Sequence, residues 1–176
     1  MVWRTVFRRS CRRCHASHGD HGVKPERMPA FVEIIERVPD VLLPYIDRWT
    51  IQEPGLLDLQ IVELMQGQID AGEAWLLKHG DTYVFLRRQT PWIGDTHIFN
   101  LGSTWNMVRA VRAITARCLQ AFVKLETCHH DKRIGSMIRR CGWRPEAVYR
   151  SAFCTRDGRF VDEYGYGIVR GEVWAE

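Results

Sequence analysis

Phe122-Val-Lys-Leu-Glu-Thr127, followed by Asp131-Lys-Arg-Ile-Gly-Ser-Met-Ile-Arg-Arg-Cys-Gly-Trp143, carries the strongest fold signal in this chain. Apolar and β-branched residues dominate the first run, which predicts a β-strand. The second run predicts a short helix that ends on Cys141-Gly142-Trp143. Residues 144–153 and 156–170 then predict two further strands, because the turn pair Asp157-Gly158 separates them. The last third of the chain is therefore expected to read strand, helix, strand, strand.

The residues upstream of this stretch predict seven more elements. Gly80-Asp81 is a hairpin turn signal between two apolar runs, and apolar residues recur at helical spacing in two segments. The expected elements are a strand at 31–36, a helix that opens at Pro39-Asp40, a helix at 56–69, strands at 74–77, 82–86 and 96–101, and a helix at 104–119. The full expected order is β-α-α-β-β-β-α-β-α-β-β.

This order of elements over residues 31–170 resembles the GNAT superfamily, the acyl-CoA-dependent N-acyltransferases. The resemblance implies an α/β (α+β) fold with a mixed, mostly antiparallel central sheet and helices on both faces. It also implies that residues 28–176 form a single domain. The turn Cys141-Gly142-Trp143 and the hairpin Arg156-Asp157-Gly158-Arg159 resemble, more loosely, degenerate GNAT-like proteins of tailed bacteriophages.

The resemblance places a cofactor loop between the strand at 96–101 and the helix at 104–119. Family members normally carry Gln/Arg-x-x-Gly-x-Gly/Ala there, and the pyrophosphate sits on the helix N-terminus, where free N–H groups favour anions. This chain reads Asn100-Leu-Gly-Ser-Thr-Trp-Asn106, with one glycine and with Trp105 where phosphate oxygens would approach. An ordinary capped turn is the alternative interpretation. The cofactor contacts implied by the resemblance are Leu101, Gly102, Ser103, Thr104, Arg109 and Asp131.

The helix that ends on Trp143 is a second point of comparison with the family. Many members carry Asn-x-x-Ala-x-x-x-Tyr-x-x-x-Gly-Phe, in which the Asn touches the cofactor and the Tyr protonates the departing thiolate. Alignment on Gly142-Trp143 puts Asp131 at the Asn and Ile138 at the Tyr. Isoleucine cannot donate a proton. The branch that acts on protein N-termini and ribosomal proteins often lacks this Tyr, and it carries a similar Arg-Asp-Gly-Arg hairpin.

A general base for amine acylation would be a carboxylate or a histidine near the central strands. Glu126 and His97 are the predicted catalytic residues, and the pair His129-His130 is a further candidate. Each has a structural alternative, such as a salt bridge for Glu126 or a solvent-facing position for His97. Cys128 and Cys141 are expected to be small buried hydrophobes rather than nucleophiles.

The basic charge of the chain is concentrated at its N-terminus. Residues 1–27 hold seven Lys or Arg against two Asp or Glu, whereas the whole chain has a net charge of +4. This segment predicts a disordered extension, and it argues against a nucleic-acid groove in residues 28–176. It also contains Cys11, Cys14, His15, His18 and His21, which could bind zinc, although a second ligand pair at zinc-finger spacing is missing. Met28 is an alternative start of the protein.

Two functions follow from the sequence. The first is an N-acetyltransferase that uses acetyl-CoA and an amine of unknown identity. The second is a non-catalytic GNAT-like binding or assembly protein, of the kind encoded among bacteriophage structural genes, which would bind a protein partner. Six cysteines without a disulfide-like framework and no apolar run long enough for a membrane span favour a cytoplasmic protein with reduced thiols, in a host cell or a virion. No metal is expected in residues 28–176.

Overall fold

The computed structural model describes residues 32–46, 57–155 and 157–171, and all structural statements below concern these residues. The elements are β1 (Glu33–Ile35), the 3₁₀ helix η2 (Asp40–Tyr45), α1 (Asp58–Asp70), β2 (Ala74–His79), β3 (Thr82–Arg88), β4 (Ile93–Asn100), α2 (Thr104–Ala121), β5 (Lys124–His129), α3 (Lys132–Arg140), β6 (Arg144–Cys154) and β7 (Phe160–Val169). The expected extension at 1–27, with its Cys and His cluster, lies outside the described residues.

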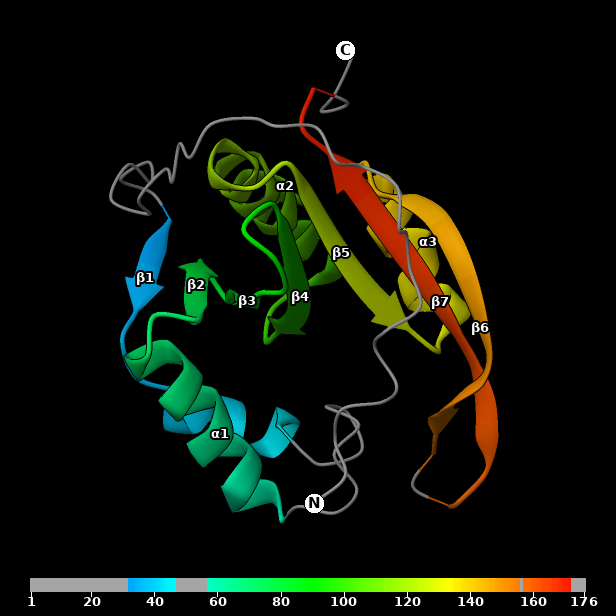
Figure 1. Cartoon of the computed structure of the whole chain (residues 1–176), viewed down its shortest axis with the longest axis horizontal. Helices are drawn as coiled ribbons and strands as arrows, with labels where there is room; N and C mark the ends of the chain where they lie inside the picture. The colour runs from blue at the N-terminus through cyan, green and yellow to red at the C-terminus, as the bar shows by residue number, and fades with distance from the viewer. Residues whose placement is uncertain (1–31, 47–56, 156, 172–176) are drawn as a thin grey trace.

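The seven strands form one sheet in the order β1-β2-β3-β4-β5-β7-β6. Every neighbouring pair is antiparallel except β4 and β5, which are parallel. In Figure 1, α1 and η2 lie on the viewer's side of the sheet, and α2 and α3 lie behind it. The predicted mixed, mostly antiparallel sheet with helices on both faces is therefore confirmed.

Two hydrophobic cores lie on opposite faces of the sheet. The larger core joins α2 and α3 to the sheet and includes Val84, Leu86, Ile114, Leu125, Trp143 and Ile168. The smaller core joins η2 and α1 to the other face and includes Leu42, Ile61, Met65, Leu76, Phe85 and Phe99. Because side chains alternate along a strand, neighbouring residues such as Leu76 and Leu77 serve different cores. In the described part of the chain no helix is long and apolar enough to cross a membrane.

Trp143 fixes the junction between α3 and β6. Gly142 has a φ of +92°, a conformation that costs little only for glycine, and it turns the chain out of the helix. Trp143 follows with 3% of its surface exposed and packs in the larger core. The burial of Trp143 at this turn, predicted from the sequence, is confirmed.

The structure differs from the sequence-based expectations at two elements. The helix predicted from Pro39-Asp40 is a six-residue 3₁₀ helix, and Pro44 within it lacks the N–H that a continuing α-helix needs. The strand expected at 96–101 begins three residues earlier, at Ile93. Gly94 obscured that start, but it packs against Leu86 and Leu125, where a Cβ atom would clash.

Candidate functional site

The two central parallel strands separate along their length, and this split organises the site. The pairing of β4 with β5 runs from Ile93↔Lys124 to Asp95↔Glu126 and stops there. Beyond that point β4 remains paired with β3 up to Asn100, and β5 remains paired with β7 up to His129. The strands visibly diverge towards their arrowheads in Figure 1. The edges of β4 and β5 that face each other beyond the last pair therefore have no strand partner among the described residues.

Two threonines close the apex of this split. The Thr96 hydroxyl donates to the Glu126 carbonyl at 3.0 Å, and the Thr127 hydroxyl donates to the Thr96 carbonyl at 2.8 Å. Both threonines are at least 96% buried. The hydroxyls satisfy the first carbonyls that the diverging strands leave without ladder partners. The sequence alone did not indicate this pair, because a buried threonine in a strand is indistinguishable from an ordinary β-branched residue.

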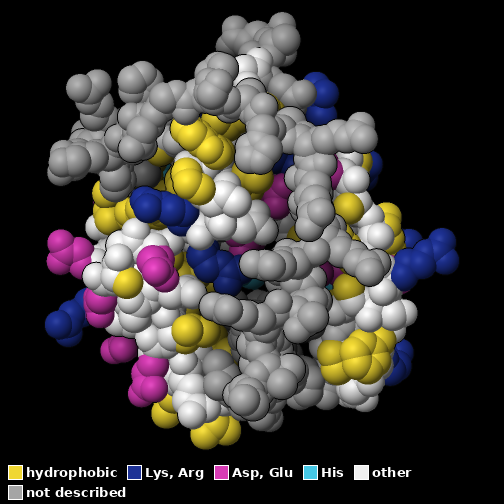
Figure 2. All heavy atoms as spheres, in the orientation of Figure 1, with side chains coloured by type: hydrophobic (Ala, Val, Ile, Leu, Met, Phe, Trp, Pro, Cys, Tyr) yellow, Lys and Arg dark blue, Asp and Glu magenta, His cyan; other side chains and the backbone are white. Residues whose placement is uncertain are grey.

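Charged and titratable side chains gather on the α1 side of the split. Leu125 and Thr127 face the α2 side, so alternation places Glu126 and Cys128 on the opposite face, as it does Asp95 and His97 of β4. Figure 2 views this face and shows Lys and Arg side chains intermixed with Asp and Glu rather than a patch of one sign. The structure thus brings the two predicted catalytic residues, His97 and Glu126, to one face at the split.

His97 lies one turn of the pleat beyond the last β4–β5 pair. Its Nε2 atom is 3.7 Å from Oδ2 of Asp95, which also forms a 2.7 Å ion pair with Arg87. Desolvation lowers the pKa of His97 below 6.5; Asp95 opposes this shift and Arg87 adds to it. The imidazole is therefore neutral at neutral pH, as a proton acceptor must be. The side chain retains 31% exposure, so a reactant can reach it.

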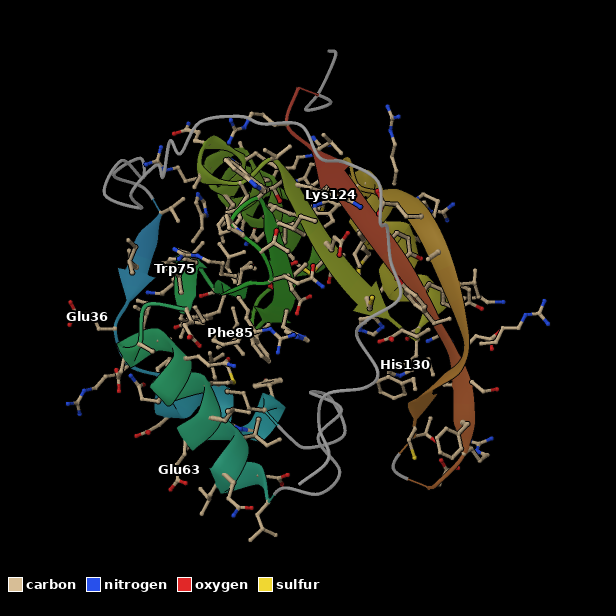
Figure 3. The ribbon with its side chains drawn as sticks, viewed as in Figure 1. Glu36, Glu63, Trp75, Phe85, Lys124 and His130 are labelled. Carbon is tan, nitrogen blue, oxygen red and sulfur yellow. The ribbon has the colours of Figure 1, made fainter. Side chains whose placement is uncertain are left out.

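Glu126 is held by a lysine rather than free. Nζ of Lys124 lies 2.7 Å from the Glu126 carboxylate and 2.6 Å from that of Glu146 on β6. In Figure 3 Lys124 lies near the start of β5, beside β7. The hydrogen bonds and charges of the two carboxylates raise the pKa of Lys124 against an opposing desolvation effect, so the ammonium persists. An ion-paired carboxylate is a weaker base than a free one, which favours the salt-bridge interpretation of Glu126.

Cys128 and Glu163 complete the cluster on this face. Desolvation of the sulfur, followed by the carboxylates of Glu163, Asp95 and Glu126, raises the pKa of Cys128 to about 12. The thiol therefore stays protonated and is a poor nucleophile, as predicted, although Cys128 is exposed rather than buried. Burial and the charge of Asp95 also raise the pKa of Glu163. Cys141 is buried, as expected.

The turn between β4 and α2 is held tightly from below. Ser103 caps α2, since its hydroxyl accepts from the Asn106 N–H at 3.3 Å, and Thr104 is the first helical residue. The Leu101 N–H donates to the Asp81 carbonyl at 2.9 Å. A Cβ atom on Gly102 would lie 2.9 Å from the Asp81 carboxylate. The side chain that crowds this turn is therefore Asp81 of the β2–β3 hairpin, while Trp105 is 73% exposed.

The cations near this turn differ in their availability. Arg109 is exposed on the second turn of α2. Arg112 donates from Nε and Nη2 to the Arg140 carbonyl at 3.2 and 2.6 Å, and so it ties α2 to the C-terminus of α3. The N-terminus of α2 offers N–H groups that suit a phosphate, and Arg109 suits its charge, but the Asp81 carboxylate opposes an anion there. The split fits the thioester arm of an acyl-CoA better than this turn fits its pyrophosphate.

The remaining predicted residues lie at the far end of β5. Asp131 caps α3, because its Oδ1 accepts from the Arg133 N–H at 2.8 Å. Ile138, at the place of the family's tyrosine, is 97% buried in the larger core. His129 accepts from the Asp131 N–H through Nδ1 at 3.0 Å, and desolvation with the nearby charge of His130 lowers the pKa of His129 to about 4. His130 lies just beyond β5 in Figure 3 and stacks on Phe153 with ring centroids 3.8 Å apart.

No group of three or more His, Cys, Asp or Glu side chains that could hold a metal occurs within the residues described.

Comparisons with known proteins identify the class of fold. No protein-family model and no curated protein matches the sequence. The structure is similar to spermidine N-acetyltransferase from Vibrio cholerae in complex with CoA and spermine, at 13% identity and a TM-score of 0.57, over 82% of this chain and 98% of that one. It is similar to the ribosomal L7/L12 alpha-N-protein acetyltransferase RimL in complex with coenzyme A, at 12% identity and a TM-score of 0.55, over 81% and 96%.

A third similar structure is the microcin C7 self-immunity acetyltransferase MccE in complex with acetyl-CoA and AMP, at 13% identity and a TM-score of 0.55, over 86% of this chain and 97% of that one. At such identities the likeness concerns the fold. The chain has the fold of the GNAT acetyltransferases, with its mixed α/β architecture and its split between two parallel strands.

Proposed function

We propose that this protein is an acyl-CoA-dependent N-acyltransferase that transfers an acetyl group from acetyl-CoA to an amine. The observation that carries the proposal is the end of β4–β5 pairing at Asp95↔Glu126, while both strands continue in the sheet. A strand edge with unpaired N–H and C=O groups binds an extended chain of amides, since those amides supply the missing hydrogen bonds. The pantetheine arm of acyl-CoA is such a chain. The similar structures crystallised with CoA or acetyl-CoA support this choice of ligand.

His97 is the proposed general base. Its imidazole is neutral at neutral pH, lies beside the split, and is oriented by Asp95 at 3.7 Å. It would accept the proton that the amine loses as a C–N bond replaces the C–S bond of the thioester. The sequence left His97 and Glu126 equivalent. The ion pair of Glu126 with Lys124 at 2.7 Å now favours His97.

The proposed contacts to the rest of acetyl-CoA involve the N-terminal end of α2. Leu101, Gly102, Ser103 and Thr104 form the turn and first helical residue, and Arg109 supplies an exposed cation one turn further on. A pyrophosphate at this end of the helix would be stabilised by free N–H groups and the helix dipole. Asp131 has a different part in this scheme, because its carboxylate caps α3 and orders the chain after β5.

A second function is favoured by one observation, the packing of Asp81 against Gly102. A carboxylate at this position repels phosphate, as expected for a GNAT-fold protein that has lost its cofactor and binds another protein instead. The two functions differ in a single property, which is the transfer of an acetyl group from acetyl-CoA.

The test is an acetyl-transfer assay on the full-length protein. Acetyl-CoA is incubated with a panel of amines that includes a polyamine, a peptide with a free N-terminus and an aminoacyl nucleotide analogue, and products are detected by mass spectrometry. We expect one class of amine to gain one acetyl group, and we expect His97→Gln to abolish the gain. Acetylation that persists unchanged in His97→Gln would remove His97 from the proposal. No acetylated product from any amine would favour the binding protein.

A further inference from the structure

The indole of Trp143 carries an unsatisfied hydrogen-bond donor beneath the split. Its Nε1 atom is fully buried and has no partner in the structure, and the side chain as a whole is 97% buried. A buried donor without an acceptor costs about 1–3 kcal/mol, so natural cores rarely keep one without a reason.

The same indole lines a cavity at the apex of the split. Thr96 of β4 and Leu125 of β5 line this cavity from the two diverging strands, together with Val84, Ile98, Val111, Ile114, Thr115, Cys118 and Trp143. Its volume is about 10 Å³. That is at the lower limit of the space one water molecule requires, and most of the lining is apolar, so water is a poor partner for the indole here.

We infer that the Trp143 indole N–H donates a hydrogen bond to a carbonyl oxygen of the acyl-pantetheine arm when the arm enters the split. This inference rests on the proposed function and adds a residue that positions the arm. A lone N–H donor among apolar side chains is matched by a single acceptor such as an amide or thioester oxygen. A charged or multiply hydrogen-bonded group would not be matched by it.

The apex threonines explain why the indole remains available for such a ligand. The hydroxyl of Thr96 is already used on the Glu126 carbonyl, and that of Thr127 on the Thr96 carbonyl. The strand carbonyls at the apex thus have donors of their own and do not need the indole. A carbonyl that arrives with the arm would be the acceptor that the Trp143 N–H lacks.

The decisive variant is Trp143→Phe, which keeps an aromatic ring in the core and removes the donor. The matched control is Trp75→Phe: Trp75 also packs against the larger core, edge-on to Phe122, but it does not line the cavity. Figure 3 shows Trp75 on β2, away from β5. Both variants must first melt cooperatively. We expect Trp143→Phe to weaken binding of CoA or acetyl-CoA about 5- to 10-fold and Trp75→Phe to leave it unchanged.

Two ligands distinguish the sources of the carbonyl oxygen. Loss of affinity for both CoA and acetyl-CoA assigns the acceptor to an amide of the arm, and loss for acetyl-CoA alone assigns it to the thioester. Either result supports the inference. Equal affinity of wild type and Trp143→Phe for both ligands overturns it.

A spectroscopic readout separates this inference from the proposed function. In the ¹⁵N spectrum of the full-length protein, the Trp143 indole signal is the one that Trp143→Phe removes from those of the seven tryptophans. We expect its proton to shift downfield when CoA is added. If CoA binds and this signal does not move, the inference fails and the proposed function stands. If neither CoA nor acetyl-CoA binds wild type at millimolar concentration, both fail.

Discussion

At the scale of single residues, His97 and its neighbours decide how the site responds to pH. Its pKa lies below 6.5, mainly because of desolvation. The imidazole becomes protonated, and so inactive as a base, only as pH falls through this lowered value. We therefore expect kcat/KM to persist below pH 6.5 and to fall in more acidic solution. His97→Gln should lower kcat/KM by about 100-fold or more and remove this acid limb.

The matched variant for His97 is Glu126→Gln, on the same face of the sheet. Lys124 keeps its contact with Glu146 at 2.6 Å when the Glu126 charge is removed. We expect this variant to retain most of the activity and the acid limb. Full activity in His97→Gln, with inactivity in Glu126→Gln, would reverse the assignment of the base.

His129 predicts a pH dependence of stability rather than activity. Its Nδ1 atom accepts from the Asp131 N–H at 3.0 Å, which a protonated nitrogen cannot do, and its pKa in the folded protein is about 4. In the unfolded chain the pKa returns to about 6.5, so the unfolded state binds more protons between these values. The contribution of neutral His129 to stability is complete above pH 6.5 and is lost as pH falls towards 4.

The measurement is the free energy of unfolding by urea at several pH values from 7 to 4. His129→Asn keeps a side-chain acceptor and does not titrate, so the dependence on pH should become shallower by close to one proton. An unchanged slope would show that His129 titrates normally.

Asp81 is expected to weaken binding of the pyrophosphate. Its carboxylate packs against Gly102 at the N-terminal end of α2. Asp81→Asn removes one negative charge there, and we expect CoA to bind about threefold more tightly at low salt, with the gain disappearing at high salt. Glu63→Gln is the control, because it makes the same charge change on α1, on the opposite face of the sheet. Equal effects of the two substitutions would contradict a local role for Asp81.

The candidate site could be predicted only in part from the sequence. His97 and Glu126 were identified as titratable residues on central strands, and the structure places them on one face at the split. The contacts that distinguish them are between residues distant in sequence, such as Asp81 with Gly102 and Lys124 with Glu146. Residue spacing along the chain contains no signal for such contacts. The unpartnered Trp143 N–H likewise becomes visible only when its surroundings are known.

At the scale of elements, α2 depends on a cap from the other end of the domain. Arg170, just after β7, donates to the carbonyls of Leu119, Gln120 and Phe122 at 2.6–3.2 Å. These are the unsatisfied carbonyls at the C-terminus of α2, where a cation also complements the helix dipole. We expect Arg170→Met to lower the free energy of unfolding by about 1–2 kcal/mol.

The control for Arg170 is Arg159→Met in the β6–β7 hairpin. Arg159 is largely exposed and pairs with Asp157 at 2.6 Å, and exposed ion pairs contribute little. Urea denaturation of both variants makes the comparison. A loss no larger in Arg170→Met than in Arg159→Met would show that the cap is dispensable.

Turn chemistry made most elements predictable. Gly80 and Gly158 have φ values of +57° and +80°, and both lie in the hairpins that Gly80-Asp81 and Asp157-Gly158 predicted. The element order was correct throughout, with η2 a 3₁₀ helix. The bounds were less predictable where tertiary packing overrides local preference, as at Gly94 inside β4. A glycine in a strand reads as a break until the side chains that fill its space are known.

At the scale of the whole molecule, the two faces of the sheet would divide the work of the proposed reaction. The α2 side carries the apolar cavity, the apex threonines and the helix N-terminus, which suit a long ligand with amides and phosphates. The α1 side carries Asp95, His97, Lys124 and Glu126, which suit an amine and its proton. The split connects the two faces. A thioester held in it would meet the amine from the opposite side of the sheet.

The most direct test of this account is calorimetric titration of acetyl-CoA into the full-length protein. The account predicts binding of one acetyl-CoA per chain with a dissociation constant in the micromolar range, and an affinity that falls as salt is added, because part of the attraction is between charges. No detectable binding at millimolar acetyl-CoA would contradict the account and leave a GNAT fold without its cosubstrate.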